Sequence, residues 1–136
     1  MQEWNHNKRW NPFNSYKLLA HVEKWKRINR GCTLPAPILV TVDPTNKCNL
    51  NCRWCNAKYI RDKNKNELSA TAMMKIADFL PYWSENDGVK SVCIAGGGEP
   101  LMNPYVGQFI DRLVMNNIEV GVVTNGLLMH QFLGPL

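Results

Sequence analysis

The chain has 136 residues, of which 45% are hydrophobic and 10% aromatic, a composition typical of one globular domain rather than a disordered segment. No apolar run approaches the roughly 18 residues that a membrane span needs, and the polar N-terminus lacks the apolar core of a signal peptide. The cysteine count of five, an odd number, fits poorly with a closed disulfide framework, so we expect a cytoplasmic protein with reduced thiols.

The net charge of +5 resides in residues 1–30, which hold seven basic and two acidic side chains. We therefore divide the chain into a basic N-terminal helical extension (1–34) and a main domain (35–136). Basic residues interleaved with Trp4, Trp10 and Trp25 could contact a nucleic acid or an acidic partner. The simpler interpretation is a solvated helix face with aromatic anchors, because charged runs usually face water.

The first expected element is a helix capped by Asn14 or Ser15 and ended by Gly31, with apolar residues at helical spacing between them. The "PAP" tripeptide (35–37) is a stiff linker at the start of the main domain. The β-branched run "ILVTV" (38–42) then predicts a buried strand.

A polar, asparagine-rich segment (43–59) follows, and we expect a long loop there, which in compact domains is usually functional. From Ser69, apolar residues at i, i+3, i+4 and i+7 predict a helix to about Pro81. The run "VKSVCIAGG" (89–97) predicts a second buried strand.

Asn103 and Pro104 resemble an N-cap followed by proline at the first helical position, so a helix is expected from there. "IEVGVVTNG" (118–126) predicts a third strand closed by a turn. "LLMHQFL" (127–133) could begin a third helix, which Gly-Pro would stop.

The order of elements predicts an α/β fold: a parallel sheet of about three strand–helix units, preceded by the N-terminal helix. Ligands of such sheets bind at the carboxyl ends of the strands. Three unusual segments follow the three strands: the cysteine-bearing loop, "GGGEP" (96–100) and Thr124-Asn125-Gly126. Their convergence on one edge is a stronger indication of a site than any one of them.

Cys48, Cys52 and Cys55 have the spacing C-x3-C-x2-C. A structural zinc prefers four ligands, and a thioredoxin-like pair leaves no role for Cys48. An iron–sulfur cluster held by three thiolates would leave one iron open for a small chelating ligand. The spacing favours the cluster over zinc or inert thiols.

The glycine-rich segment is not a P-loop, since no Gly-Lys-Ser/Thr follows, and it misses the dinucleotide fingerprint at Leu101. Adjacent glycines after a buried strand let backbone approach a ligand closely, and Glu99 supplies an acceptor for a cationic group. A plain tight turn is the alternative, both here and at Thr124-Asn125-Gly126.

The cysteine spacing, with an aromatic residue before the last cysteine, resembles the signature of the radical SAM superfamily. The resemblance implies that Cys48, Cys52 and Cys55 hold a 4Fe-4S cluster and that S-adenosylmethionine chelates its fourth iron. It further implies an electron donor and reductive cleavage of S-adenosylmethionine to a 5′-deoxyadenosyl radical, which abstracts a substrate hydrogen. Trp54 matches the aromatic position beside the adenine.

The same resemblance implies that Gly97, Gly98 and Glu99 contact the amino group of the methionyl moiety. It places Thr124 and Asn125 among the polar groups that line the cofactor site. The family's usual core is a partial barrel of six strand–helix units, so three units correspond to half of a partial TIM-like barrel.

We therefore expect a piece of a longer enzyme, or a second copy or partner chain that completes the sheet. The segments "DPTNKCNLNCRWC" and "GGGEPLMNP" resemble members that modify peptides or proteins. The alternative function is a non-catalytic metal- or cluster-binding module that acts through a partner protein or nucleic acid.

Overall fold

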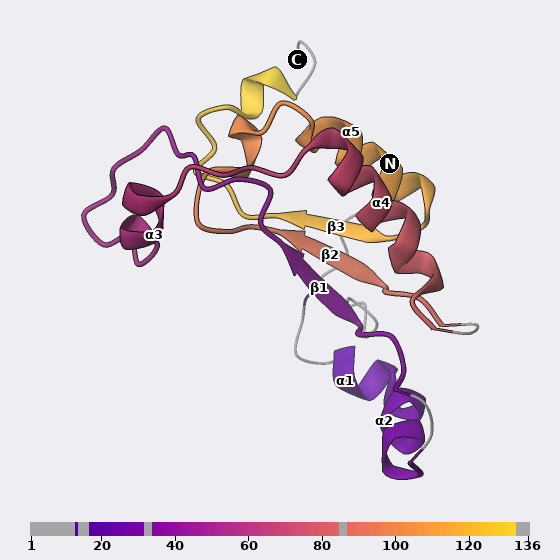
Figure 1. Ribbon diagram of the computed structural model, residues 1–136. Helices are drawn as coiled ribbons and strands as arrows, with labels where there is room; N and C mark the ends of the chain where they lie inside the picture. The colour runs from indigo at the N-terminus through magenta and orange to yellow at the C-terminus, as the bar shows by residue number, and fades with distance from the viewer. Residues whose placement is uncertain (1–12, 14–16, 32–33, 85–86, 133–136) are drawn as a thin grey trace.

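The computed structural model describes residue 13 and residues 17–31, 34–84 and 87–132. Its centre is a parallel three-stranded sheet in the order β1-β2-β3 (Figure 1). The strands are β1 (Leu39–Val42), β2 (Ser91–Ile94) and β3 (Glu119–Val122). The predicted α/β class and parallel sheet are therefore confirmed.

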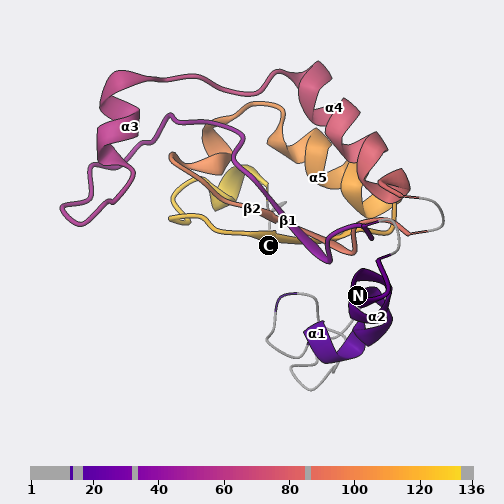
Figure 2. The same cartoon turned by 60° about the horizontal axis from the view of Figure 1, so that its bottom comes forward.

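Five α-helices occur in the described part of the chain: α1 (Lys17–Ala20), α2 (Val22–Asn29), α3 (Lys58–Lys63), α4 (Ala70–Phe79) and α5 (Val106–Met115). Helices α4 and α5 pack side by side on one face of the sheet, whereas α3 stands apart, beyond the carboxyl end of β1 (Figures 1 and 2). None of the described helices has both the length and the apolar character that a membrane crossing needs.

The core lies between the sheet and these two helices. Val92 and Ile94 of β2 are fully buried there, because β2 is the central strand and pairs with β1 on one side and β3 on the other. The helices contribute Met73 from α4, and Phe109 and Leu113 from α5, all fully buried. Burying each large apolar side chain contributes about 1.5–3 kcal/mol, so this layer fixes the sheet that carries the loops.

The two packed helices begin in different ways. The predicted helix from Ser69 is present as α4, and Ser69 caps it, since its hydroxyl accepts a hydrogen bond from the backbone N–H of Ala72 at 3.2 Å. The prediction that Asn103 caps the next helix directly was wrong, because α5 begins at Val106 after a turn. The carbonyl-type oxygen Oδ1 of Asn103 instead accepts from the backbone N–H of Tyr105 at 2.9 Å, inside that turn.

The N-terminal helix is interrupted at His21, so α1 and α2 replace the single helix that the sequence predicts. Gly31 ends α2 as expected, with a φ of 68° that favours glycine. The predicted caps Asn14 and Ser15 and the side chains of Trp4 and Trp10 lie outside the described residues.

The charged face of α2 does not lie wholly in water. Lys24 is largely buried, and its Nζ lies 2.7 Å from Asp87 Oδ2 and 2.7 Å from the carbonyl oxygen of Ala36. Arg27 also faces Asp87, with Nη1 3.8 Å from Oδ2. The expectation of a solvated helix face is therefore wrong at Lys24, whereas the Arg27 side chain stays 37% exposed. Lys24 attaches α2 to the main domain.

Strand β3 forms one edge of the sheet, and Val123 just after it is 62% exposed. The expected third helix is represented in the described residues by a single 3₁₀ turn, Met129–Gln131. No strand of the described residues pairs with the outer edge of β3. An open apolar edge invites pairing with another strand, so completion of the sheet by a partner or second copy stays a prediction.

Candidate functional site

Three loops meet at the carboxyl edge of the sheet, as the parallel order requires. We name them the cysteine loop (43–57, after β1), the glycine loop (96–99, after β2) and the TNG turn (124–126, after β3). Figures 1 and 2 show the three connections leaving neighbouring strand ends on the same side. Hydrogen bonds between the loops, described next, bring predicted site residues together.

The glycine loop packs directly on the root of the cysteine loop. The backbone N–H of Glu99 donates to the carbonyl oxygen of Lys47 at 2.7 Å. A Cβ on Gly98 would lie 2.1 Å from that same oxygen, and a Cβ on Gly96 would lie 2.6 Å from Asp43 Cγ. Gly96 also has a φ of 131°, so both positions require glycine, one for conformation and one for close approach.

The Glu99 carboxylate is buried, with 2% of the residue exposed, and both of its oxygens accept hydrogen bonds from the protein. Its Oε1 accepts from the Thr124 hydroxyl at 2.7 Å and from the Leu101 backbone N–H at 3.1 Å. Its Oε2 accepts from the Asn125 backbone N–H at 2.8 Å. Glu99 therefore ties the glycine loop to the TNG turn.

The TNG turn in turn contacts the cysteine loop. Asn125 donates from Nδ2 to Oδ1 of Asn49 at 2.8 Å, a contact between residues 76 positions apart. Within the turn, the Thr124 hydroxyl also accepts from the backbone N–H of Gly126 at 3.1 Å, and Gly126 has a φ of 80°. The structure thus joins Glu99, Thr124 and Asn125, and adds Asn49, which the sequence alone did not single out.

The three motif thiols lie in the cysteine loop, with Cys48 and Cys55 half-buried and Cys52 exposed. A turn joins the last two, since the Cys55 N–H donates to the Cys52 carbonyl at 3.3 Å. Within the described residues, no three His, Cys, Asp or Glu side chains lie close enough to hold a metal ion. Three free thiols in one loop are nonetheless the ligand type that an iron–sulfur cluster requires.

The cysteine loop is held on its far side by α3, a helix that the sequence did not predict. Arg61 donates from Nη1 to the carbonyl oxygen of Leu50 at 2.9 Å. At the base of the loop, Thr45 and Glu67 form an antiparallel bridge. The loop is therefore fixed at its root and near its first cysteine.

Trp54 is predicted to lie beside the adenine of the cofactor, but the residue is 85% exposed. The guanidinium carbon of Arg53 lies 5.5 Å from the ring centroid, a cation–π arrangement. The structure does not bring Trp54 to the other site residues. Its exposed ring leaves a face open for stacking.

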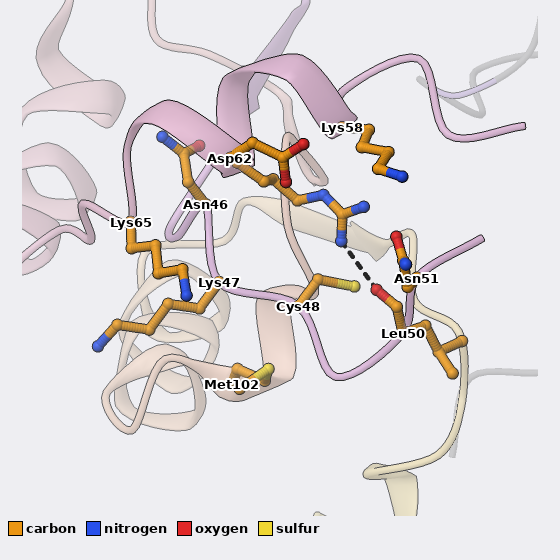
Figure 3. Close-up of a pocket in the computed structure, with 10 residues that line it drawn as sticks. Asn46, Lys47, Cys48, Leu50, Asn51, Lys58, Asp62, Lys65 and Met102 are labelled. Atoms are coloured by element: carbon orange, nitrogen blue, oxygen red, sulfur yellow. Dashed lines mark hydrogen bonds between the residues drawn. The ribbon is translucent and has the colours of Figure 1, made fainter. Parts of the chain in front are cut away.

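A hollow of about 440 Å³ lies between the cysteine loop and α3. Figure 3 shows Lys58 and Asp62 of the helix on one side and the Cys48 thiol on the other. Its charged lining is formed by Lys47, Lys58, Arg61, Lys65 and Asp62, with a positive balance that attracts anionic groups. The basic run "KYIRDKNK" (58–65) is the sequence feature that could have indicated it.

Asn103, which the sequence predicts only as a helix cap, has a larger structural role. It is fully buried, and its Nδ2 donates to the carbonyl oxygens of Pro44 at 3.0 Å and Leu68 at 2.9 Å. Pro44 lies at the start of the segment that contains the cysteine loop and α3, and Leu68 lies at its end. Asn103 therefore joins the two ends of this segment.

Comparison with known proteins points to one family. The model of the radical SAM superfamily matches residues 42–133, which include every motif described above. The chain is 34% identical over 80 residues to 7-carboxy-7-deazaguanine synthase of Clostridium acetobutylicum, covering 58% of this chain and 34% of that protein. It is 33% identical over 94 residues to GTP 3′,8-cyclase of Helicobacter pylori, covering 68% and 28%.

A third relative is the antilisterial bacteriocin subtilosin biosynthesis protein AlbA of Bacillus subtilis. It is 30% identical over 99 residues, covering 71% of this chain and 20% of that protein. The chain thus spans between 20% and 34% of the length of these three relatives.

Proposed function

Because the chain belongs to the radical SAM superfamily, we propose that it forms the part of a radical enzyme that binds a 4Fe-4S cluster and S-adenosylmethionine. Cys48, Cys52 and Cys55 are the proposed cluster ligands, which leaves one iron for the cofactor. With both bound, the cluster would supply an electron for the reductive cleavage of S-adenosylmethionine and so for radical chemistry on a substrate.

The observation that carries this proposal is the contact between the glycine loop and the cysteine loop. The Glu99 N–H reaches the Lys47 carbonyl at 2.7 Å, one residue before Cys48. A cofactor that chelates an iron held by the cysteine loop would therefore lie beside the glycine loop. In this proposal the cysteine loop supplies the metal ligands and the adjacent glycine loop supplies contacts to the cofactor, both at one edge of the sheet.

The remaining predicted residues take supporting roles in the proposal. Gly97 and Gly98 offer backbone without side chains to the cofactor's amino group. Thr124 and Asn125 border the same edge of the sheet, and Trp54 offers an exposed aromatic face to the adenine. An external electron donor is part of the proposal.

For the substrate we propose a peptide or protein. The support is the resemblance carried by the cysteine and glycine motifs, together with the relative named for the biosynthesis of a bacteriocin. The other two relatives are named for a deazaguanine product and for GTP, so the names of the three relatives do not point to one substrate class. A cytoplasmic location is also proposed, supported by the free thiols of the described cysteines.

The test is anaerobic reconstitution with iron and sulfide, followed by reduction in the presence of S-adenosylmethionine. We expect about four irons per chain, a reduced-cluster electron paramagnetic resonance (EPR) signal that changes on adding the cofactor, and release of 5′-deoxyadenosine. Cys48→Ala, Cys52→Ala and Cys55→Ala should each lose the cluster. Cys93→Ala, which changes a half-buried cysteine of β2, is the matched control and should keep it.

A chain that binds zinc and no iron would contradict the proposal. The alternative, a non-catalytic module acting through the basic N-terminal helix, has less support in the structure. Lys24 and Arg27, two of the cations that would serve a partner, face Asp87 of the main domain instead.

A further inference from the structure

A chain of hydrogen bonds runs across all three loops of the site. It begins at the Glu99 carboxylate, which accepts from the Thr124 hydroxyl at 2.7 Å and the Asn125 N–H at 2.8 Å. It ends where Asn125 Nδ2 donates to Asn49 Oδ1 at 2.8 Å, one residue after Cys48. We call the Asn125–Asn49 hydrogen bond the loop tether.

Glu99 is the buried anchor of this chain. Both of its carboxylate oxygens accept hydrogen bonds from the protein, and two of the three donors belong to the TNG turn. Hydrogen bonds to an ionised carboxylate are roughly twice as strong as neutral ones. A turn held in this way gives Asn125 a fixed position from which to reach the cysteine loop.

The direction of the tether follows from a second contact of Asn125. The backbone N–H of Leu127 donates to Asn125 Oδ1 at 3.0 Å. The side-chain oxygen of Asn125 is therefore committed to its own turn, and its NH₂ group faces the cysteine loop. Asn49 must then present its oxygen, not its nitrogen.

We propose that Asn49 and Asn125 are positioning residues that set the course of the cysteine loop at its first thiol, with Glu99 as their anchor. The proposal rests on the proposed function in so far as this loop is the cluster site. Asn49 is tethered to the TNG turn, and the next residue, Leu50, is held by Arg61 of α3. The chain just after Cys48 is thus fixed from two separate elements.

The direction of the tether decides which variants keep it. Asn49→Ala removes the acceptor, whereas Asn49→Asp keeps an oxygen facing Asn125 and should retain the tether. Asn125→Ala removes the donor, whereas Asn125→Asp lets Asn49 turn its amide and donate from Nδ2 to the new carboxylate, so the tether should form in reverse. Both asparagines are exposed, so these variants should fold. Asn56→Ala, at an exposed asparagine of the same loop outside the tether, is the matched control.

The first measurement is amide hydrogen exchange of the cluster-free chain, followed by mass spectrometry of peptides that cover 47–57. Asn49→Ala and Asn125→Ala should raise exchange there about three- to tenfold, the worth of one hydrogen bond. Asn49→Asp and Asn56→Ala should behave like the unaltered chain, and so should Asn125→Asp through the reversed hydrogen bond. Melting temperatures should agree across the set.

The second measurement uses the reconstituted protein and reports on positioning itself. Iron release to a chelator should be faster in Asn49→Ala and Asn125→Ala, and the EPR change on adding S-adenosylmethionine should be altered in both. Asn49→Asp should restore both. If no variant or control takes up iron, the proposed function fails, while the exchange data still decide the tether.

The anchor is tested with Glu99→Gln, which puts an NH₂ group against donors and should raise exchange in both the TNG turn and the cysteine loop. Because this buried change could unfold the chain, Thr124→Val serves as a second, milder variant. Two results would overturn the proposal: Asn49→Ala indistinguishable from the unaltered chain, or Asn49→Asp as impaired as Asn49→Ala.

Discussion

Lys24 of α2 and Asp87 of the segment before β2 form a nearly buried ion pair, each side chain 12% exposed, with Nζ 2.7 Å from Oδ2. Lys90 adds a further cation at 3.5 Å from Oδ1, beside Arg27, and Lys24 also donates to the Ala36 carbonyl. A largely buried carboxylate with several cationic partners is costly to leave unpaired. This pair therefore holds the N-terminal extension to the main domain.

We expect Lys24→Met to lower the free energy of unfolding by about 1.5–3 kcal/mol, the usual worth of hydrogen bonds to a charged group. Urea denaturation followed by circular dichroism measures the loss. Lys26→Met is the control, because Lys26 pairs with Glu23 on the exposed side of α2. Equal losses in the two variants would show that the ion pair with Asp87 carries no special weight.

The same pair predicts a pH dependence at acid pH. Burial would raise the pKa of Asp87, but the hydrogen bond and charge of Lys24 and the charge of Lys90 outweigh it and hold the pKa below 3.8. A depressed folded-state pKa stabilises the protein above the unfolded value, and this contribution is lost as pH falls through the folded value. Stability should therefore drop below about pH 3.8, and Asp87→Asn should make that drop smaller.

His21, beside the same cations, predicts a separate step nearer neutrality. Burial and the charges of Lys24 and Lys90 lower its pKa below 6.5. The unfolded chain then takes up a proton before the folded one, so stability declines as pH falls from 6.5 toward the folded value. Thermal melts between pH 7 and 5 should show this decline in the unaltered chain and a smaller one in His21→Gln.

Asn103 should be among the most sensitive polar positions. Asn103→Ala would leave the part-buried Leu68 carbonyl without its side-chain donor and the Tyr105 N–H without its acceptor. The Pro44 carbonyl would lose one of its two donors and keep the Leu68 N–H. Each unsatisfied group costs about 1–3 kcal/mol, so we expect severe destabilisation in denaturant. Asn103→Asp keeps the acceptor for Tyr105 but loses the donor, and should be impaired as well. A well-folded Asn103→Ala protein would contradict this assignment.

The sheet could be predicted from the sequence because its signals are local. The runs around Val40, Val92 and Val120 are apolar and β-branched, and the parallel order follows from the alternation with helices. The loops at the strand ends could likewise be placed on one edge. Neither conclusion needs knowledge of any side-chain contact.

The tertiary contacts of the site could not be predicted in the same way. Asn103 meets Pro44 across 59 positions and Asn125 meets Asn49 across 76, and an asparagine carries no mark of its partner. Helix α3 lacks an apolar face and is fixed through Arg61 to Leu50. The break at His21 likewise has no mark in the helical periodicity of the sequence.

Gly98 and Gly97 offer a final test, because neighbouring glycines face different obstacles. A Cβ at Gly98 would meet the backbone oxygen of Lys47 at 2.1 Å, and backbone cannot move aside cheaply. A Cβ at Gly97 would meet Asn46 Oδ1 at 2.8 Å, the end of a side chain that can rotate away. Gly98→Ala should therefore cost about 1–3 kcal/mol by overpacking and reduce iron uptake, whereas Gly97→Ala should leave the cluster-free chain stable. Denaturation of both variants without iron tests this difference. If the two glycines served only to make room for the cofactor, the two unfolding curves would be alike.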